Sequence, residues 1–341
     1  MKATIRDIAE MASVSTATVD RVLNGRAGVK LTNRYRVLQA ADKLGYLPKT
    51  DTLSMPSRPA QLEFVLPVGT NHFLAKLADH IEDFCSRLPL VSVCRLHRLE
   101  TTHSGELLEA LDRLDIETAG VGVVAVEDPR SCAAISRLTE AGLRVVTVVS
   151  DLPTTSRANY VGIDNRIAGR TVGKLLGHML NSHAQDVALF LGSHKYRGHE
   201  EREAGFRSVL SEEFTNVSVS EVAETDDDTK KGYASAQSIL ARNTKIGAVY
   251  CAGGGRSGVI RAVREQFHNT DRPLVVCHDL TEDTKEALLD GSIDIVIDQN
   301  ARLIAEQATI QLLGTLASFA PFLTKKLVEP RIITRENIPL T

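Results

Sequence analysis

Ten short apolar runs, each of strand length, occur from residue 62 onward and alternate with longer amphipathic segments. Their apolar character is continuous, which indicates strands buried on both faces, as in a parallel sheet covered by helices. About ten β–α units are too many for one compact sheet, so the pattern predicts an α/β body of two doubly wound lobes. The runs are Leu62–Leu66, Val91–Leu96, Val121–Val126, Val145–Val149, Tyr160–Ile163, Val187–Leu191, Val217–Val222, Ala248–Cys251, Leu274–Cys277 and Ile293–Ile297.

Polar residues directly follow several of these runs, at the strand ends where such folds bind ligands. They are Asn71, Ser150, Asp151, Asp164, Asp279, Asp298 and Gln299, with Arg202 in the helix after Val187–Leu191. Carboxylates, amides and one arginine, without a nucleophile and base pair, suit multidentate hydrogen bonding to hydroxyl groups. For any one residue a helix cap is the simpler interpretation, but the repeated position favours a shared site.

The stretch Thr4–Asn24 contains two helical stripes of apolar residues, separated by a break at residues 12–14. Thr4, with Asp7 three positions later, can cap the first helix, and Ser15 can cap the second. This spacing is typical of a helix-turn-helix, whose second helix enters the major groove of DNA. A helical hairpin inside a larger all-helical domain is the alternative.

The second helix would use its two faces differently if it binds DNA. The residues expected to face the bases are Thr16, Ala17 and Arg21, and those expected to pack inward are Val19, Val22 and Leu23. Arginine is the commonest side chain to read guanine, so Arg21 is the leading candidate for a specific contact.

A third helix, Thr32–Leu44, closes a small bundle, and Gly45 ends it. Residues 49–60 are polar and contain Pro56 and Pro59, which predicts a linker. We therefore expect a helix-turn-helix domain at 1–48, a linker or hinge at 49–60 and a body at 61–341. The body should divide into an N-lobe of about 61–161 plus 299–325 and a C-lobe of about 162–298 plus 326–341.

The net charge of −3 hides an asymmetry, because residues 1–50 hold nine Lys/Arg against four Asp/Glu. A basic head on an acidic body indicates that a polyanion binds at one end only. No apolar run approaches the roughly 18 residues of a membrane span, and no secretory segment follows Met1, so we expect a cytoplasmic protein without a membrane partner. Five cysteines without CxxC spacing argue against a disulfide or zinc framework.

One segment favours an enzyme. Gly253, Gly255 and Gly258 match GxGxxG between a predicted strand and helix, and Asp279 ends the next strand, which is the context of a dinucleotide site. An NAD-dependent oxidoreductase is therefore the alternative function. Other catalytic motifs are missing from the sequence, and we expect no metal, no cofactor and no enzymatic activity.

The head resembles the DNA-binding domain of the lactose-repressor (LacI/GalR) family through Asp7–Glu10 (DIAE), Val14–Val19 (VSTATV), Arg21–Asn24 (RVLN) and Gly45–Pro48 (GYLP). The body is similar to the effector domain of the same family, which resembles periplasmic ribose-binding proteins. The body segments that carry the likeness are Val161–Asn165, Arg202–Phe206, His278–Asp279 and Asp298–Gln299.

The resemblance implies two sets of site residues. The set for DNA is Thr4, Ser15, Thr16, Ala17, Thr18, Arg21, Asn24, Asn33, Arg34 and Met55. The set for a small effector is Asn71, Phe73, Ser150, Asp151, Arg202, Gly253, Asp279 and Gln299, with Gly253 at the position of a family asparagine. Two further departures are Asp20, near an expected phosphate, and a linker in which Leu53 or Met55 replaces the family's minor-groove leucine.

The implied function is a homodimeric transcription regulator, a repressor, that binds double-stranded operator DNA. A sugar or polyol bound between the lobes would modulate its affinity for the operator. The sequence leaves open whether the ligand induces or corepresses. It also leaves open a third alternative, in which the head contacts another protein.

Overall fold

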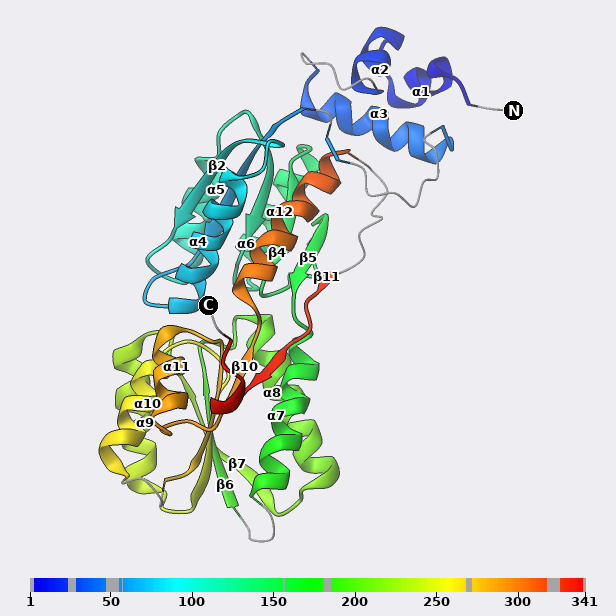
Figure 1. Cartoon of the computed structure of the whole chain (residues 1–341). Coiled ribbons are helices and arrows are strands. Elements are labelled where there is room, and N and C mark those ends of the chain that lie inside the picture. The colour runs from blue at the N-terminus through cyan, green and yellow to red at the C-terminus, as the bar shows by residue number, and fades with distance from the viewer. Residues whose placement is uncertain are drawn as a thin grey trace.

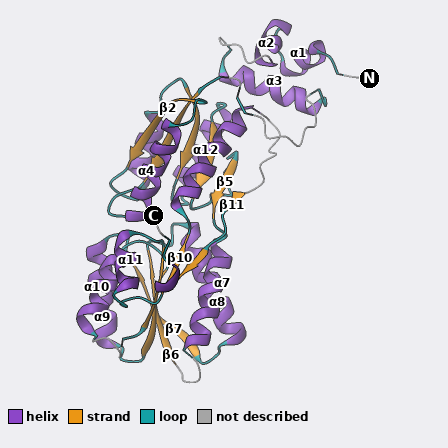
Figure 2. Cartoon of the chain, in the orientation of Figure 1, coloured by secondary structure: helices purple, strands orange, loops and turns teal. Residues whose placement is uncertain are grey.

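The computed structural model of the chain describes residues 3–23, 29–46, 55–56, 58–155, 157–180, 185–267, 272–317 and 326–339. Among these residues a small helical head is joined to a body of two lobes, each built on a mostly parallel sheet (Figure 1). Helices cover both faces of each sheet, as the colouring by secondary structure shows (Figure 2). The predicted fold class is confirmed.

The head consists of α1 (Ile5–Ala12), α2 (Thr16–Leu23) and α3 (Leu31–Lys43). Thr4 and Asp7 form a complete capping box at the start of α1, and Ser15 Oγ accepts from Thr18 N at 3.2 Å at the start of α2. Ser13 has φ = 51°, a left-handed conformation that turns the chain between the two helices. The head has its own apolar core, formed by Ile8, Ala9, Ala12, Val19, Val22, Val37, Leu38, Ala40 and Ala41.

The N-lobe sheet has the strand order β11-β5-β4-β3-β1-β2. Its strands are β1 (Ala60–Leu66), β2 (Val91–Arg98), β3 (Thr118–Val123), β4 (Arg144–Val148), β5 (Asn159–Gly162) and β11 (Lys326–Leu327). Its helices are α4 (His72–Ser86), α5 (Ser104–Asp112), α6 (Pro129–Glu140) and α12 (Ala301–Ala317). Every residue of β1 is buried, because this strand lies between β2 and β3 with helices on both faces.

The C-lobe sheet repeats this arrangement in the order β12-β10-β9-β8-β6-β7. Its strands are β6 (Gln185–Leu191), β7 (Val217–Glu224), β8 (Ile246–Cys251), β9 (Leu274–His278), β10 (Ile295–Asp298) and β12 (Arg331–Ile333). Its helices are α7 (Asn165–Met179), α8 (Arg197–Glu213), α9 (Thr229–Arg242), α10 (Arg256–Gln266) and α11 (Glu282–Leu289), followed by a 3₁₀ turn, η1 (Arg335–Asn337).

The chain crosses between the lobes three times: from β5 to α7, from β10 to α12 and from β11 to β12. All ten predicted strands are present in the predicted sequence order, and β11 and β12 are additional. We expected residues 326 onward in the C-lobe, but Lys326 and Leu327 pair with β5, so the last crossing follows Leu327. No helix in the described ranges is long and apolar enough to span a membrane.

Candidate functional site

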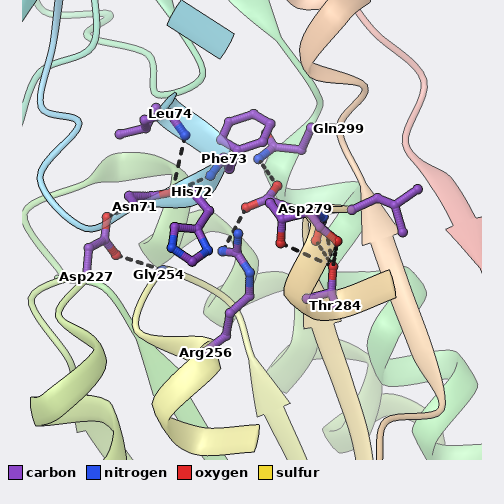
Figure 3. A network of polar contacts seen from close by, with 12 residues as sticks. Asn71, His72, Phe73, Leu74, Asp227, Gly254, Arg256, Asp279, Thr284 and Gln299 are labelled. Carbon is purple, nitrogen blue, oxygen red and sulfur yellow. Dashed lines mark hydrogen bonds and ion pairs between the residues drawn. The ribbon is translucent and has the colours of Figure 1, made fainter. Parts of the chain in front are cut away.

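A small cavity lies between the lobes, where loops leave the carboxyl ends of both sheets. Its volume is about 30 Å³, which is room for roughly two water molecules. Much of the polar network in its wall is drawn in Figure 3. The cavity is lined by Asn71, Phe73, Leu74, Val124, Val149, Ser150, Tyr196, Gly198, His199, Arg202, Asp227, Gly253, Gly254, Asp279 and Gln299.

Asn71 is fixed in the N-lobe wall because it caps helix α4. Its Oδ1 accepts from Phe73 N at 3.0 Å and from Leu74 N at 3.3 Å. The cap leaves only the amide nitrogen free to bond elsewhere, and Nδ2 donates across the cavity to Asp227 Oδ2 at 3.0 Å. The phenyl ring of Phe73 supplies a buried apolar surface beside it.

The second N-lobe contribution comes from the loop after β4. Val149 has φ = 66°, a conformation that is strained for a β-branched residue and is typical of functional loops. It is followed by Ser150, whose Oγ accepts from Gly198 N of the C-lobe at 3.2 Å. Asp151 does not line the cavity, because its carboxylate is held by Arg157 and by Thr147 Oγ1 at 3.0 Å.

Arg202 is the buried cation of the C-lobe wall, with 2% of its surface exposed. Its Nε donates to Asn165 Oδ1 at 2.8 Å, and its Nη1 donates to Ala252 O at 2.6 Å. Both partners are neutral oxygens, so these bonds orient the guanidinium without neutralising its charge. The rest of its donor fork is available to a bound molecule.

Asp279 belongs to the same C-lobe wall, directly after β9, and has φ = 70°. Gln299 Nε2 donates to its Oδ1 at 2.7 Å, and Arg256 Nη1 lies 3.3 Å from its Oδ2. Burial raises the pKa of Asp279, although the positive charges of Arg256 and Arg202 oppose this effect. Within the described residues, two buried oxygens at the cavity have no hydrogen-bond partner: Gln299 Oε1 and Tyr196 Oη.

His199 is the titratable ring of the cavity. Loss of hydration lowers its pKa to about 4, even though the negative charge of Asp227 raises it. The ring is therefore neutral at physiological pH. Its Nδ1 lies 3.2 Å from both the nitrogen and the carbonyl oxygen of Ser193, which orients the ring.

The structure brings seven of the eight residues expected at the effector site to this cavity: Asn71, Phe73, Ser150, Arg202, Gly253, Asp279 and Gln299. Asp151 is the exception. Two other strand-end acids also point elsewhere, since Asp164 caps α7 and Asp298 pairs with Arg331.

Sequence reasoning missed Tyr196, His199 and Asp227, which line the same cavity. Tyr196 and His199 follow β6 and Asp227 follows β7, so each obeys the strand-end rule that identified the others. Applying this rule to polar side chains several residues beyond the strand end would have found them.

The exposed surface of the head lies at the start of α2. Ser15, Thr16, Ala17 and Arg21 are exposed, Thr18 is half-buried, and Val19 and Val22 are buried against the other helices. This is the division of faces expected for a helix that reads DNA. Thr4 is exposed at the start of α1.

The remaining residues expected to contact DNA differ in their exposure. Asn33 and Arg34 are half-buried in α3, where burial lowers the pKa of Arg34, and Asp20 is half-buried in α2. Met55 is exposed and belongs to no helix or strand. Asn24 and Leu53 lie outside the described residues.

Comparison with known families agrees with both parts of the structure. Residues 62–317 match the periplasmic binding protein domain family, and residues 4–49 match the bacterial regulatory proteins of the lacI family. The chain belongs to the lacI family.

Relatives match over most of this lacI-family chain. An uncharacterized HTH-type transcriptional regulator from Streptomyces limosus is 27% identical and aligns with 97% of the chain and 93% of its own length. The HTH-type transcriptional repressor PurR of Vibrio campbellii is 26% identical over 73% of each chain. An ABC transporter solute-binding protein from Burkholderia graminis, solved with D-arabinose, has a TM-score of 0.76 at 21% identity and covers 83% of this chain and 98% of its own.

The oxidoreductase alternative has no support from the family or the geometry. The glycines of the GxGxxG segment allow neighbouring loops to approach, because a Cβ on Gly253 would lie 2.2 Å from Gly192 N and one on Gly258 would lie 1.9 Å from Thr229 O. Gly254 N already donates to Asp227 Oδ1 at 2.7 Å. In this lacI-family member, other groups of the protein therefore fill the space around the glycine turn. The turn itself forms part of the cavity wall.

Proposed function

We propose that this chain is a DNA-binding repressor whose operator affinity is set by a sugar or polyol bound between its lobes. The observation that carries the proposal is one chain that joins a helix-turn-helix, with one face of its second helix exposed, to a cavity between two lobes that is lined by both charged and apolar side chains. The DNA contacts that we propose are Thr4, Ser15, Thr16, Ala17, Thr18, Arg21, Asn24, Asn33, Arg34 and Met55.

The chemistry of the cavity supports a hydroxylated ligand. Arg202 offers donors, Asp279 and the unpartnered Gln299 Oε1 offer acceptors, and Phe73 offers an apolar face for a sugar ring. The effector residues that we propose are Asn71, Phe73, Ser150, Arg202, Gly253, Asp279 and Gln299. Asp151 does not line the cavity, and we propose that it holds the loop that carries Ser150. The Burkholderia protein, which has a similar fold, was solved with D-arabinose, a ligand of this class.

The proposed repressor acts as a homodimer in the cytoplasm, where its DNA is. Two heads related by a twofold axis suit a near-palindromic operator. Because the N-lobe is joined to the head, a change in the angle between the lobes alters the spacing of the heads. A ligand changes DNA affinity only if it binds one arrangement of the lobes more tightly than the other.

A thermal-shift screen tests the effector, using D-arabinose, D-ribose, D-xylose and myo-inositol as probes. A probe at about 100 times its dissociation constant adds roughly 2.7 kcal/mol to the stability of the folded state. The expected result is a concentration-dependent rise in Tm with a matching change in operator affinity. A ligand that stabilises the protein but leaves operator affinity unchanged would contradict the coupling.

For the head, Arg21→Ala should weaken operator binding by about 1–3 kcal/mol, because an exposed arginine on the reading face is expected to contact a guanine. Binding to an operator selected from random sequence, measured over a range of salt, is the test. Random duplex DNA is the control, and an equal loss on both DNAs would make Arg21 a phosphate contact. Binding that does not fall with salt would instead indicate that the head contacts a protein.

A further inference from the structure

Several hydrogen bonds and ion pairs join the lobes around the cavity, and Asp227 contributes two of them. Asp227 Oδ2 accepts from Asn71 Nδ2 at 3.0 Å, and its backbone oxygen accepts from Thr70 Oγ1 at 3.1 Å. Its other carboxylate oxygen accepts from Gly254 N at 2.7 Å within the C-lobe. Asp227 therefore links two loops of its own lobe to the opposite lobe.

The geometry requires two acceptor oxygens at residue 227. The Oδ1 of Asn71 is committed to the cap of α4, so the group facing Asp227 must be the NH₂ donor. The partner on the other side is also a donor, the backbone N–H of Gly254. A carboxylate satisfies both donors, whereas an amide of the same shape satisfies one and opposes its NH₂ to the other.

The local backbone is arranged to bring this carboxylate into the cavity wall. Asp227 has φ = 57° and only 7% of its surface is exposed. A Cβ on Gly254 would lie 2.6 Å from Asp227 Cγ, so the glycine makes room for the carboxylate. The neighbouring acids act within the C-lobe: Asp226 pairs with Lys231, and Asp228 caps α9.

We propose that Asp227 links the two lobes across the cleft and selects the effector, a role that rests on the proposed function. A cavity of about 30 Å³ is too small for a sugar, so its wall must move to admit one, and the bond between Asp227 and Asn71 is the part of the wall that we propose opens. A neutral hydroxyl group can insert between them, because it donates to the carboxylate and accepts from the amide. A carboxylate or phosphate group of a ligand cannot donate and would meet the negative charge of Asp227. The preferred effector presents an uncharged hydroxyl group at this point.

The first test measures closure in the full-length protein without ligand. Asp227→Asn is compared with Asp226→Asn, which removes one charge from the same loop at a residue that also has positive φ, where asparagine is well tolerated. Hydrogen–deuterium exchange should rise about tenfold at Gly254 and the first turn of α4 in Asp227→Asn, and stay at the wild-type rate in Asp226→Asn. Unchanged exchange in Asp227→Asn would overturn the proposal.

Thr70→Ala is a second variant for the same test, because Thr70 is exposed and its loss should not impair folding. It removes one of the bonds that Asp227 makes to the N-lobe, so exchange at the same amides should rise, by less than in Asp227→Asn. If exchange in Thr70→Ala stays at the wild-type rate, the bond between Thr70 Oγ1 and the backbone oxygen of Asp227 does not hold the lobes together.

The second test measures selection with matched pairs of probes, D-ribose with D-ribose 5-phosphate and D-arabinose with D-arabinonate. Wild-type protein should prefer the neutral member, and Asp227→Asn should reduce that preference about tenfold while Asp226→Asn preserves it. Equal binding of the neutral and anionic members by wild-type protein would overturn selection by Asp227. If no sugar or polyol binds, the proposed effector class fails, while the exchange experiment still decides whether Asp227 links the lobes across the cleft.

Discussion

The two lobes share one strand order, yet they build opposite walls of the cavity from different chemistry. The N-lobe wall is mainly apolar and consists of Phe73, Leu74, Val124 and Val149 with the small polar groups of Asn71 and Ser150. The C-lobe wall carries the charged and titratable groups Tyr196, His199, Arg202, Asp227 and Asp279. One architecture therefore presents a mainly apolar wall in the first lobe and a charged wall in the second.

The difference extends to how each wall is supported. Arg202 is oriented by Asn165 and Ala252, both on the C-lobe side of the first crossing, and Asp279 is oriented by Arg256 and Gln299. These bonds fix the positions of the charged groups within the C-lobe, which would lower the cost of binding the proposed ligand. In the N-lobe wall, Asn71 is held by the cap of α4 and also bonds across the cavity, and Ser150 Oγ bonds across it to Gly198 N.

The largest effect should follow loss of the C-lobe cation. Arg202→Ala should lower the free energy of unfolding by about 3–5 kcal/mol and abolish the effector response, because it leaves Asn165 Oδ1 and Ala252 O without donors and opens a cavity. Urea denaturation and the thermal-shift screen measure these two effects. Arg207→Ala on the same helix is the control, since its exposed pair with Glu203 should contribute at most about 1 kcal/mol. Equal losses in both variants would show that Arg202 contributes no more to stability and effector response than an exposed arginine on the same helix.

The next effect is a pH dependence that the C-lobe wall confers. The pKa of His199 is about 4 in the folded protein and near 6.5 when unfolded, so the unfolded state binds a proton first as the pH falls. Stability should fall by roughly 3 kcal/mol between about pH 6.5 and pH 4, and His199→Gln should remove that loss. Urea midpoints measured across this range are the readout.

His194→Gln is the matched control for the pH experiment. Burial disfavours the charged ring of His194, but hydrogen bonds to Glu224 and Glu203 outweigh this and raise its pKa. Its stabilising effect is present at low pH and is lost as the pH rises through the raised pKa. Removing His194 should therefore leave the acid-side loss in place. If the loss disappears in this variant instead, His199 is not its source.

The smallest effect should come from the N-lobe wall. Ser150→Ala removes the acceptor for Gly198 N and should cost about 1 kcal/mol of unfolding free energy, because a single neutral hydrogen bond is lost at the cleft. Effector affinity should fall by no more than about tenfold. A loss as large as that of Arg202→Ala would show that the two walls share recognition equally.

The elements were predictable where local pattern determines structure. Runs such as Leu62–Leu66 and Ala248–Cys251 are apolar along their whole length and form buried strands, and the capping box of Thr4 and Asp7 starts α1 as expected. Strands β11 and β12 have two and three residues, too few to show a pattern. They pair only because the chain returns to each sheet after α12.

The cavity was predictable in outline, but not residue by residue. Asp227 belongs to an Asp-Asp-Asp run, a composition typical of a solvated loop, and it is buried only because its left-handed backbone meets Gly254, 27 residues later in the chain. Asp151 has the right position after a strand, but Arg157 turns it away from the cavity. Local sequence does not encode these long-range pairings, so position alone placed Asp151 at the cavity, which it does not line, and missed Tyr196, His199 and Asp227.

The three crossings between the lobes have a mechanical consequence, because all of them involve the same edge of each sheet, at β5 and β11 in one lobe and at β10 and β12 in the other. Three connections along one edge of each sheet should oppose twisting and sliding of the lobes more than bending about that edge. The head sits at the end of the N-lobe farthest from these connections (Figure 1). In the proposed mechanism the N-lobe is a lever arm: a small opening beside Asp227 becomes a larger displacement at the head.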